Sequence, residues 1–364
     1  MTKRLGERLI KPSTRALWRE RKSSGIGVGE WLHGYIYTRW PYLYIGSAKG
    51  EHPLSWLMVP FILLMNVFRP FTPGRREKFR RQGKVNFADS YHGKPMPLDE
   101  AVKLVRVDRP VTMTLPESVL PYPVARDIVL QNPDHIAVLD CPCRAHAKTP
   151  CTPLDVCIVV GEPFASFVVE HHPKRSRWIT PDEAVDILKA EDARGHVHHA
   201  FFKDGMLGRF YAICNCCSCC CGAMEAQRNG VEMLCSSGYV CELDAEACVA
   251  CGNCVQYCQF GAISSGNGVT AIDADKCFGC GVCTSKCPKD ALTLRRDPSR
   301  GEPLLVADML GGEMPEAMRD AMEGMEGMMA DATPDTAPGP SSGPSSGTGT
   351  DATSEAPRDD VPGR

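Results

Sequence analysis

The sequence predicts an α+β protein in which a small C-terminal module, over about 241–300, is appended to a mixed α/β, cysteine-rich domain over 91–240. Three observations predict this architecture. Helical and strand-like patterns alternate between about residues 97 and 213, cysteines gather beside the strand-like runs, and a cysteine motif is duplicated inside the C-terminal module.

Two helices are predicted in the mixed domain. In the first, the apolar residues Leu98, Ala101, Val102 and Val105 recur at helical spacing. The second begins at the capping box Thr180-Pro181-Asp182-Glu183, which has proline at the first helical position, and runs to about residue 194, before a glycine that favours a helix end.

Three short β-type runs lie next to cysteine groups. They are 135–139 (HIAVL), 157–160 (CIVV) and 210–213 (FYAI). Strands fix the backbone while the adjoining loops leave side chains free, so we expect a site where these strands end.

The N-terminal region, 1–90, is basic and aromatic and contains an apolar segment at 54–68. Fifteen residues are fewer than the roughly 20 that a helix needs to span a bilayer. Basic residues follow up to position 84, which suits a membrane-surface contact through 54–84. A second interpretation of this segment is a buried helix beside a solvated charged stretch, and a third is a helix that truly spans the membrane.

Two further segments follow the C-terminal module. Residues 301–331 are predicted to form a methionine-rich helix, whose methionines suit a packing or partner-binding face better than a metal site. Residues 332–364 are rich in proline, glycine, serine, threonine and aspartate, and we expect this tail to be disordered. The methionines of the stripe are Met314, Met318, Met322, Met325 and Met329.

Cysteine is the unusual component of this chain. Twenty cysteines occur among 364 residues, and the first 30 residues contain no apolar core typical of a secretory signal. Many thiols in a long chain of this kind predict metal ligation in a reducing compartment, the cytoplasm, rather than a disulfide framework. The net charge of −3 argues against nucleic acid as a partner.

The strongest motif is an internal repeat whose copies begin at Cys248 and Cys277. Each copy has three cysteines with two residues between successive cysteines, and a fourth cysteine after three intervening residues. The gaps let three thiolates converge from one tight loop, and glycines relieve crowding there. The repeated cysteines are Cys248, Cys251, Cys254 and Cys258 in the first copy and Cys277, Cys280, Cys283 and Cys287 in the second.

This repeat resembles the bacterial two-cluster ferredoxins, which makes the C-terminal module a ferredoxin-like dicluster module. The resemblance covers about 55 of the 364 residues and implies two [4Fe–4S] clusters with crossed ligands. Gln259 departs from the pattern, because the family usually has proline there. Structural zinc is the alternative, but it leaves cysteines unused. The implied ligand sets are Cys248, Cys251, Cys254 and Cys287 for one cluster and Cys277, Cys280, Cys283 and Cys258 for the other.

The cysteines upstream predict at least one additional metal centre, an iron–sulfur cluster or zinc, with thiol redox chemistry as the alternative. Thiolates packed this densely repel one another unless a metal neutralises them or they oxidise. Arg144 is expected to offset negative charge. Cys235 and Cys241 lie between these groups and the repeat. The candidates are Cys141, Cys143, Cys151 and Cys157, which together form one full set of four, and the run Cys214, Cys216, Cys217, Cys219, Cys220 and Cys221.

Two weaker resemblances concern the same region. The combination of cysteine groups upstream of a ferredoxin repeat is similar to bacterial multi-cysteine iron–sulfur proteins. Cys220-Cys221-Gly222 is similar to the CCG motif of heterodisulfide-reductase-type subunits, although the long spacings of that family are missing. The nearby histidines His196, His198 and His199 are interpreted as exposed or capping residues rather than ligands.

Two function classes follow. The first is an iron–sulfur electron-transfer protein or redox subunit that works with redox partner proteins. The second is a reductase, heterodisulfide-type or small-molecule, with a catalytic cysteine or metal site in 141–241 that the ferredoxin module supplies with electrons. A set of four thiolates closes the coordination of a relay centre, so an electron carrier or oxidoreductase component is favoured over an independent enzyme. No catalytic residue is assigned.

Overall fold

The computed structural model describes residues 10–56, 60, 90–121, 126–312, 318–320 and 322, and all structural statements below concern these residues. The chain divides into two compact units, Met1–Ala332 and Thr333–Arg364, and every described residue belongs to the first. The predicted disordered tail therefore lies outside the described residues, as does most of the apolar and basic segment 54–84. No helix among the described residues is both long and apolar enough to cross a bilayer.

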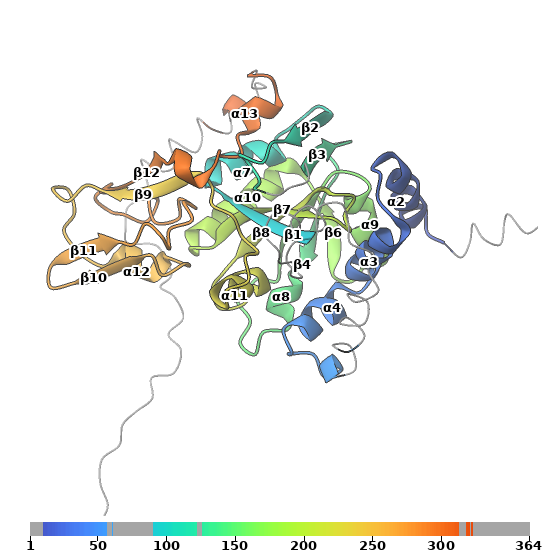
Figure 1. Cartoon of the computed structure of the whole chain (residues 1–364), viewed down its shortest axis with the longest axis horizontal. Helices are drawn as coiled ribbons and strands as arrows, with labels where there is room; N and C mark the ends of the chain where they lie inside the picture. Colours follow the sequence, from blue (N-terminus) through green and yellow to red (C-terminus); the bar gives the residue numbers. More distant parts are fainter. Residues whose placement is uncertain are drawn as a thin grey trace, which may run out of the picture. The chain divides into compact units, whose positions relative to one another are not determined.

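A large, mainly antiparallel sheet forms the centre of the mixed domain (Figure 1). A hairpin of β2 (Val111–Leu115) and β3 (Arg126–Leu130) joins it through a parallel contact between β3 and β8. The remaining strands lie in the order β1 (Tyr91–Met96), β7 (Val197–Lys203), β8 (Arg209–Cys216), β5 (Asp155–Val160), β4 (Ile136–Asp140) and β6 (Ser176–Ile179).

Two hydrophobic cores lie on the two faces of this sheet because side chains alternate along each strand. On β4, Ile136 and Val138 belong to one core, and Ala137 between them belongs to the other. The first core is covered by α7 (Leu98–Val105), α10 (Pro181–Ala193) and α13 (Val306–Met309). Met318 and Met322 also pack there, whereas the other methionines of the predicted stripe lie outside the described residues.

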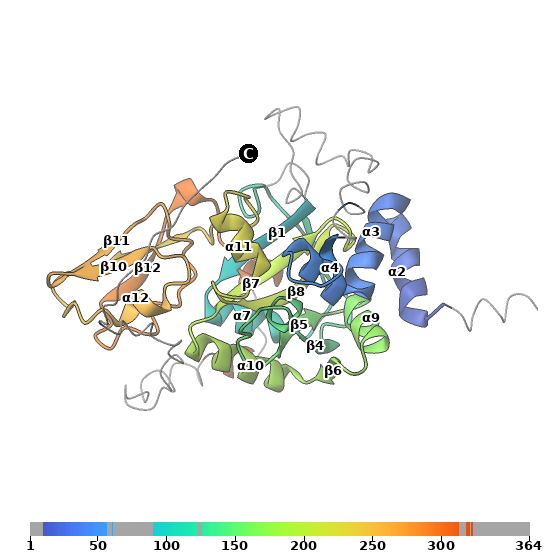
Figure 2. The ribbon, with the colours of Figure 1, turned by 90° about the horizontal axis from the view of Figure 1, so that it is seen from below.

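N-terminal helices cover the second core. Leu17 of α2 is buried there with Phe164 and Phe167 of α9. Figure 2 shows α2 and α3 beside α9, on the side of the sheet away from α10. The helices that cover this core are α2 (Pro12–Ser23), α3 (Val28–Arg39) and α9 (Phe164–His171), whereas α4 (Pro41–Ala48) packs against α8 (Pro142–Ala145).

The predicted elements of the mixed domain are confirmed. Strands β4, β5 and β8 lie at the three β-type runs, with β4 beginning one residue later than predicted, at Ile136, and α7 occupies the first predicted helix. At the start of α10 the Thr180 hydroxyl accepts a hydrogen bond from the Glu183 amide at 3.2 Å, as a capping box requires. The helix ends at Ala193, and Gly195 adopts a φ of +81°.

The C-terminal module is built from two small antiparallel ribbons. The first strand, β9 (Tyr239–Leu243), pairs with the last, β12 (Leu292–Arg296), so the ends of the module are tied together. Between them lie α12 (Asn253–Tyr257) and the hairpin of β10 (Ile263–Gly266) and β11 (Val269–Ile272). The protein is thus a mixed α+β structure, with the duplicated cysteine motif in its C-terminal part.

Candidate metal centres

One cavity of the C-terminal module collects cysteines from both copies of the repeat. Three come from the loop around α12, and Cys287 reaches the same cavity from the second copy. The cavity also contacts Gly252, whose φ of +74° turns the loop where a side chain at that position would be strained. The cysteines that line it are Cys248, Cys251, Cys254 and Cys287.

A second cavity collects the complementary set. Cys258 of the first copy reaches the three closely spaced cysteines of the second. Cys241, which is outside the repeat, also lines this cavity, and its Sγ lies 3.5 Å from Cys283 Sγ. The cysteines that line it are Cys241, Cys258, Cys277, Cys280 and Cys283.

Backbone amides surround these sulfurs. The amide of Ala262 donates to Cys258 Sγ at 3.2 Å, and the amide of Ala291 donates to Cys287 Sγ at 3.3 Å. The two contacts occupy the same place in each copy of the repeat. Hydrogen bonds to thiolate sulfur stabilise the charged form and are one way in which a protein adjusts the potential of a cluster.

Residues 247–292 match the family model of the 4Fe-4S dicluster domain. The chain contains a ferredoxin-type domain within a larger cysteine-rich protein. No curated protein and no solved structure gives a match to the chain. The mixed domain upstream of the ferredoxin-type domain therefore has to be interpreted from its own residues.

Four upstream cysteines form a compact group, which we call the four-thiol site: Cys151, Cys217, Cys219 and Cys220. Their sulfurs all lie within 4.8 Å of one another, and the distances from Cys151 Sγ are 3.2 Å to Cys219, 3.7 Å to Cys220 and 3.8 Å to Cys217. A tetrahedral ion with metal–sulfur bonds of about 2.3 Å separates its sulfurs by roughly 3.8 Å. The four-thiol site therefore fits a single tetrahedral metal ion, zinc or iron.

The thiols of this site interact strongly. Hydrogen bonds from Cys217 and Cys219 hold the pKa of Cys220 well below its usual value. Burial raises the pKa of Cys151 to about 12. A bound cation removes such protons, so metal loading at this site should release protons.

Six further upstream cysteines line a neighbouring cavity, which we call the six-thiol cavity and whose wall also includes Cys217 and Cys220 of the four-thiol site. The six are Cys141, Cys143, Cys157, Cys214, Cys216 and Cys221. The predicted set of four is therefore not a single group in the structure. Cys151 lies in the four-thiol site, whereas Cys141, Cys143 and Cys157 line the six-thiol cavity. The physical reason is long-range strand pairing, because β5 lies against β8 with Cys157 opposite Cys214.

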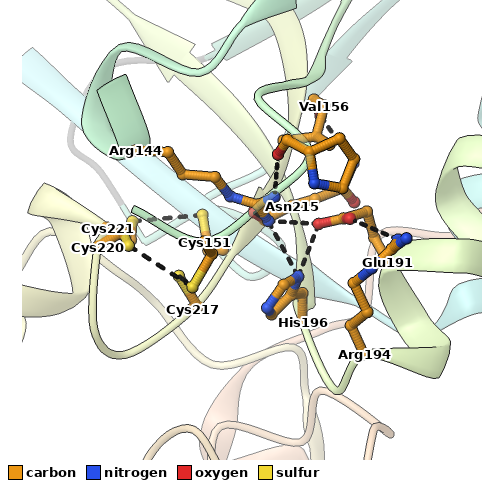
Figure 3. A network of polar contacts seen from close by, with 12 residues as sticks. Arg144, Cys151, Val156, Glu191, Arg194, His196, Asn215, Cys217, Cys220 and Cys221 are labelled. Carbon is orange, nitrogen blue, oxygen red and sulfur yellow. Dashed lines mark hydrogen bonds and ion pairs between the residues drawn. The ribbon is translucent and has the colours of Figure 1, made fainter. Parts of the chain in front are cut away.

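Arg144 lies beside both groups (Figure 3). Its side chain is 1% exposed and forms a buried ion pair with Glu191. It also donates to the carbonyl oxygens of Pro153 and Asn215, at 2.7 and 3.1 Å. The positive charge of Arg144 therefore neutralises the Glu191 carboxylate as well as acting on the thiolates. Its bond to the Pro153 carbonyl also fixes the loop that carries Cys151.

The interpretation of the three histidines as exposed or capping residues was wrong. His196, His198 and His199 are all buried. His196 Nδ1 lies 2.6 Å from Glu191, and His198 Nδ1 lies 2.6 Å from the side-chain oxygen of Asn215. Strand β7 runs between β1 and β8 inside the sheet, which leaves none of its side chains at the surface.

The ferredoxin-type domain contacts the mixed domain at residues that the sequence did not identify. Lys286 pairs with Asp192 at 3.0 Å, and Ser285 also donates to Asp192 at 3.1 Å. The rings of Phe260 and His199 meet edge to face with their centroids 6.4 Å apart. The sequence signal that could have identified this interface is Gln259, which stands where the ferredoxins that the domain resembles usually have proline.

Proposed function

We propose that this chain is an iron–sulfur electron-transfer protein or redox subunit. The ferredoxin-type domain holds two [4Fe–4S] clusters in the cavities described above, and the four-thiol site holds a redox-active iron. When bound, such centres accept and donate one electron at a time. The support is the family match, the two sets of cysteines around separate cavities, and the tetrahedral spacing of the four thiols.

The observation that carries the proposal is the position of Gln259. It follows Cys258 directly, and its side-chain oxygen accepts a hydrogen bond from the Ser218 amide at 2.7 Å. Ser218 stands between Cys217 and Cys219 of the four-thiol site. The other end of the Gln259 side chain donates to the Gly195 carbonyl at 2.9 Å. One residue therefore connects a cluster cavity to the upstream site by covalent bonds and a hydrogen bond.

Gln259 also explains why the ferredoxin pattern is broken here. Ferredoxins of the type that this domain resembles usually have proline at this position, and proline has no polar side chain to form either hydrogen bond. A free-standing ferredoxin has no neighbouring domain to bind in this way. The replacement supports a domain that delivers electrons within its own chain.

Replacing Gln259 tests the proposal. We expect Gln259→Pro to leave the iron and sulfide content unchanged, because residue 259 is not a ligand, and to slow electron transfer to the four-thiol site at least about tenfold. Stopped-flow absorbance after mixing with a low-potential reductant measures the rate. Gln256→Ala is the matched control, since that exposed glutamine bonds only to Asn253 within α12. An unchanged rate in Gln259→Pro contradicts the proposed route.

A reductase is the second candidate, and the six-thiol cavity favours it. A relay needs no enclosed space beside its centre, whereas a reductase needs room for a substrate. This cavity is lined by cysteines and by the hydroxyl-bearing Tyr37, Tyr91 and Tyr211. Electron-dependent consumption of a disulfide by the fully loaded chain would establish the reductase. A loaded chain that only exchanges electrons with protein partners would exclude it.

Cytoplasmic localisation, redox partner proteins and a membrane-surface contact through 54–84 also belong to the proposal. The twenty free cysteines support a reducing compartment. Trp56, at the start of the apolar segment, is 73% exposed and suits the interface of a membrane. Co-sedimentation with anionic vesicles tests this contact, and a chain that stays in the supernatant at low salt contradicts it.

A further inference from the structure

The six-thiol cavity is a partly open space among α4, α8 (Pro142–Ala145), β5 and β8. Its volume is about 80 Å³, several times the roughly 10–15 Å³ that a single water needs. The proposed electron route to the four-thiol site gives these six thiols no task. We propose that the six-thiol cavity binds a polynuclear iron–sulfur cluster, distinct from the metal ion of the adjoining four-thiol site and from the clusters of the ferredoxin-type domain.

The six sulfurs form a continuous row around the cavity. Cys157 Sγ lies within hydrogen-bonding reach of both Cys141 and Cys214. Cys143 is likewise in reach of Cys141 and Cys221. Cys221 in turn lies 3.3 Å from Cys216, Sγ to Sγ. Every one of the six therefore has at least one other as its direct neighbour.

Their spread distinguishes this row from the four-thiol site. Among the described residues, the four-thiol site is the one group of three or more ligand-type side chains whose ligand atoms all lie within 4.8 Å of one another. The six sulfurs are thus both too many and too widely spaced for one tetrahedral ion, which takes four ligands. Thiolates that surround a space instead of a point suit a cluster of several metal ions.

Rigid elements hold these thiols in place. Cys214 and Cys216 lie on β8 two residues apart, so they share one face of the strand. Cys157 lies on the neighbouring β5, and Cys141 and Cys221 are the residues that precede α8 (Pro142–Ala145) and α11 (Gly222–Arg228). Sites built on strands and helix ends are positioned more accurately than sites on loops.

Three cations lie near the cavity, and two of them are also paired with carboxylates, Arg144 with Glu191 and Lys49 with Glu51. The charge of Arg144 acts on Cys141, and that of Lys49 acts on Cys143. Lys49 is fixed beside the cavity by its bond to the Cys220 carbonyl at 2.9 Å. Lys203 lies over the rings of Tyr37 and Tyr91, 4.5 and 4.9 Å from their centroids. An anionic iron–sulfur cluster would find compensating charge on several sides.

The tyrosines supply hydrogen-bond donors at one end of the cavity. The hydroxyls of Tyr37 and Tyr211 lie 3.0 Å apart, and Tyr91 joins them. Burial raises the pKa of Tyr37 well above its usual value, with Cys214 and Cys143 adding to the shift, so its hydroxyl stays protonated. Protonated hydroxyls beside a cluster donate to its sulfurs or to a group bound there.

Iron and acid-labile sulfide counts on the anaerobically reconstituted full chain test this inference. Two cubanes and one iron ion account for about nine irons. We expect at least about four irons and four sulfides more. A wild-type chain that saturates at about nine irons or fewer overturns the inference without any variant.

Variants then assign the extra iron. Cys141→Ser with Cys214→Ser should lose at least about four irons together with sulfide, and should keep the electron paramagnetic resonance signals of the ferredoxin-type domain, which report folding. Cys219→Ser, in the four-thiol site, should lose about one iron and no sulfide. Cys235→Ser is the matched control, a buried cysteine outside both groups whose thiol donates to the Gly93 carbonyl. Retention of all iron by the double variant contradicts the inference.

The inference and the proposed electron route fail separately. A slow Gln259→Pro variant with only about nine irons per chain supports the route and overturns the cluster. The opposite result is extra iron that depends on Cys141 and Cys214, together with normal electron transfer in the Gln259→Pro variant. That result supports the cluster in the six-thiol cavity and overturns the electron route.

Discussion

Buried polar residues of the mixed domain show how side chains outside the thiol groups hold the site together. Arg144, Glu191 and His196 form one network, and Glu191 accepts hydrogen bonds from both partners. Burial alone would raise the pKa of Glu191, but the bonds from His196 and Arg144 outweigh it and hold the pKa below its usual value. Removing one member of such a buried pair leaves the other uncompensated, which typically costs about 3–5 kcal/mol.

His199 gives a pH-dependent prediction at this scale. Burial lowers its pKa from 6.5 to about 3. Between these values the unfolded chain binds a proton that the folded protein excludes, so the free energy of unfolding falls as the pH falls below 6.5. At pH 5.5 this histidine alone removes about 1.4 kcal/mol compared with neutral pH.

The matched variant is His199→Leu, which removes the titrating ring. We expect the stability difference between the wild type and this variant to shrink by about 1.4 kcal/mol between pH 7.5 and 5.5. Anaerobic urea denaturation of metal-free protein at the two pH values measures it. A difference that stays constant would show that His199 is protonated in the folded state.

Loops and turns of the ferredoxin-type domain depend on glycine where the chain passes close to itself. Gly279 has a φ of +65°, and a Cβ atom there would lie 2.2 Å from the Tyr239 carbonyl oxygen. Tyr239 belongs to β9, so the cysteine loop of the second copy lies directly against the ribbon that closes the domain.

Gly279→Ala should therefore disrupt the second cluster cavity. We expect loss of about four irons from the reconstituted chain, since the loop that carries Cys277 and Cys280 cannot keep its position. Gly268→Ala is the control, because its φ of +75° imposes similar backbone strain while nothing lies within 4 Å of the added Cβ. Equal iron content in the two variants contradicts the steric explanation.

Sequence patterns predicted the individual helices and strands better than they predicted which strands pair with one another. Period and capping signals placed α7, α10, β4, β5 and β8, because these depend on residues close in the sequence. The pairing of β5 with β8, which separates Cys151 from Cys157, depends on contacts about 57 residues apart, between Cys157 and Cys214. No local pattern encodes that register, so the upstream cysteines were grouped by proximity along the chain.

At the scale of the whole molecule, two facts could not be obtained from the sequence. The N-terminal helices supply walls of the six-thiol cavity, with Tyr37 from α3 and Ile45 from α4. Nothing in an aromatic, basic segment identifies the surface that it covers. The second fact is the interface around Gln259, which emerged from the sequence only as a missing proline.

The two domains are joined at residues that are next to cysteines in the sequence, because Gln259 follows Cys258 and its partner Ser218 lies between Cys217 and Cys219. Asp192, Gly195 and Ser218 receive side chains from the ferredoxin-type domain on the edge of the mixed domain that bears the four-thiol site. An interface that fixes the separation of two centres is what one-electron transfer within a chain requires. This arrangement supports the proposal that electrons pass from the ferredoxin-type domain to the upstream site.

Rapid freeze-quench electron paramagnetic resonance of the full chain, mixed with less than one equivalent of a low-potential reductant, is the decisive measurement of this electron transfer. We expect the signals of the ferredoxin-type domain to appear first and to decline as the upstream iron is reduced. Ferredoxin signals that persist unchanged, or a four-thiol site that contains zinc and accepts no electron, would contradict the proposal.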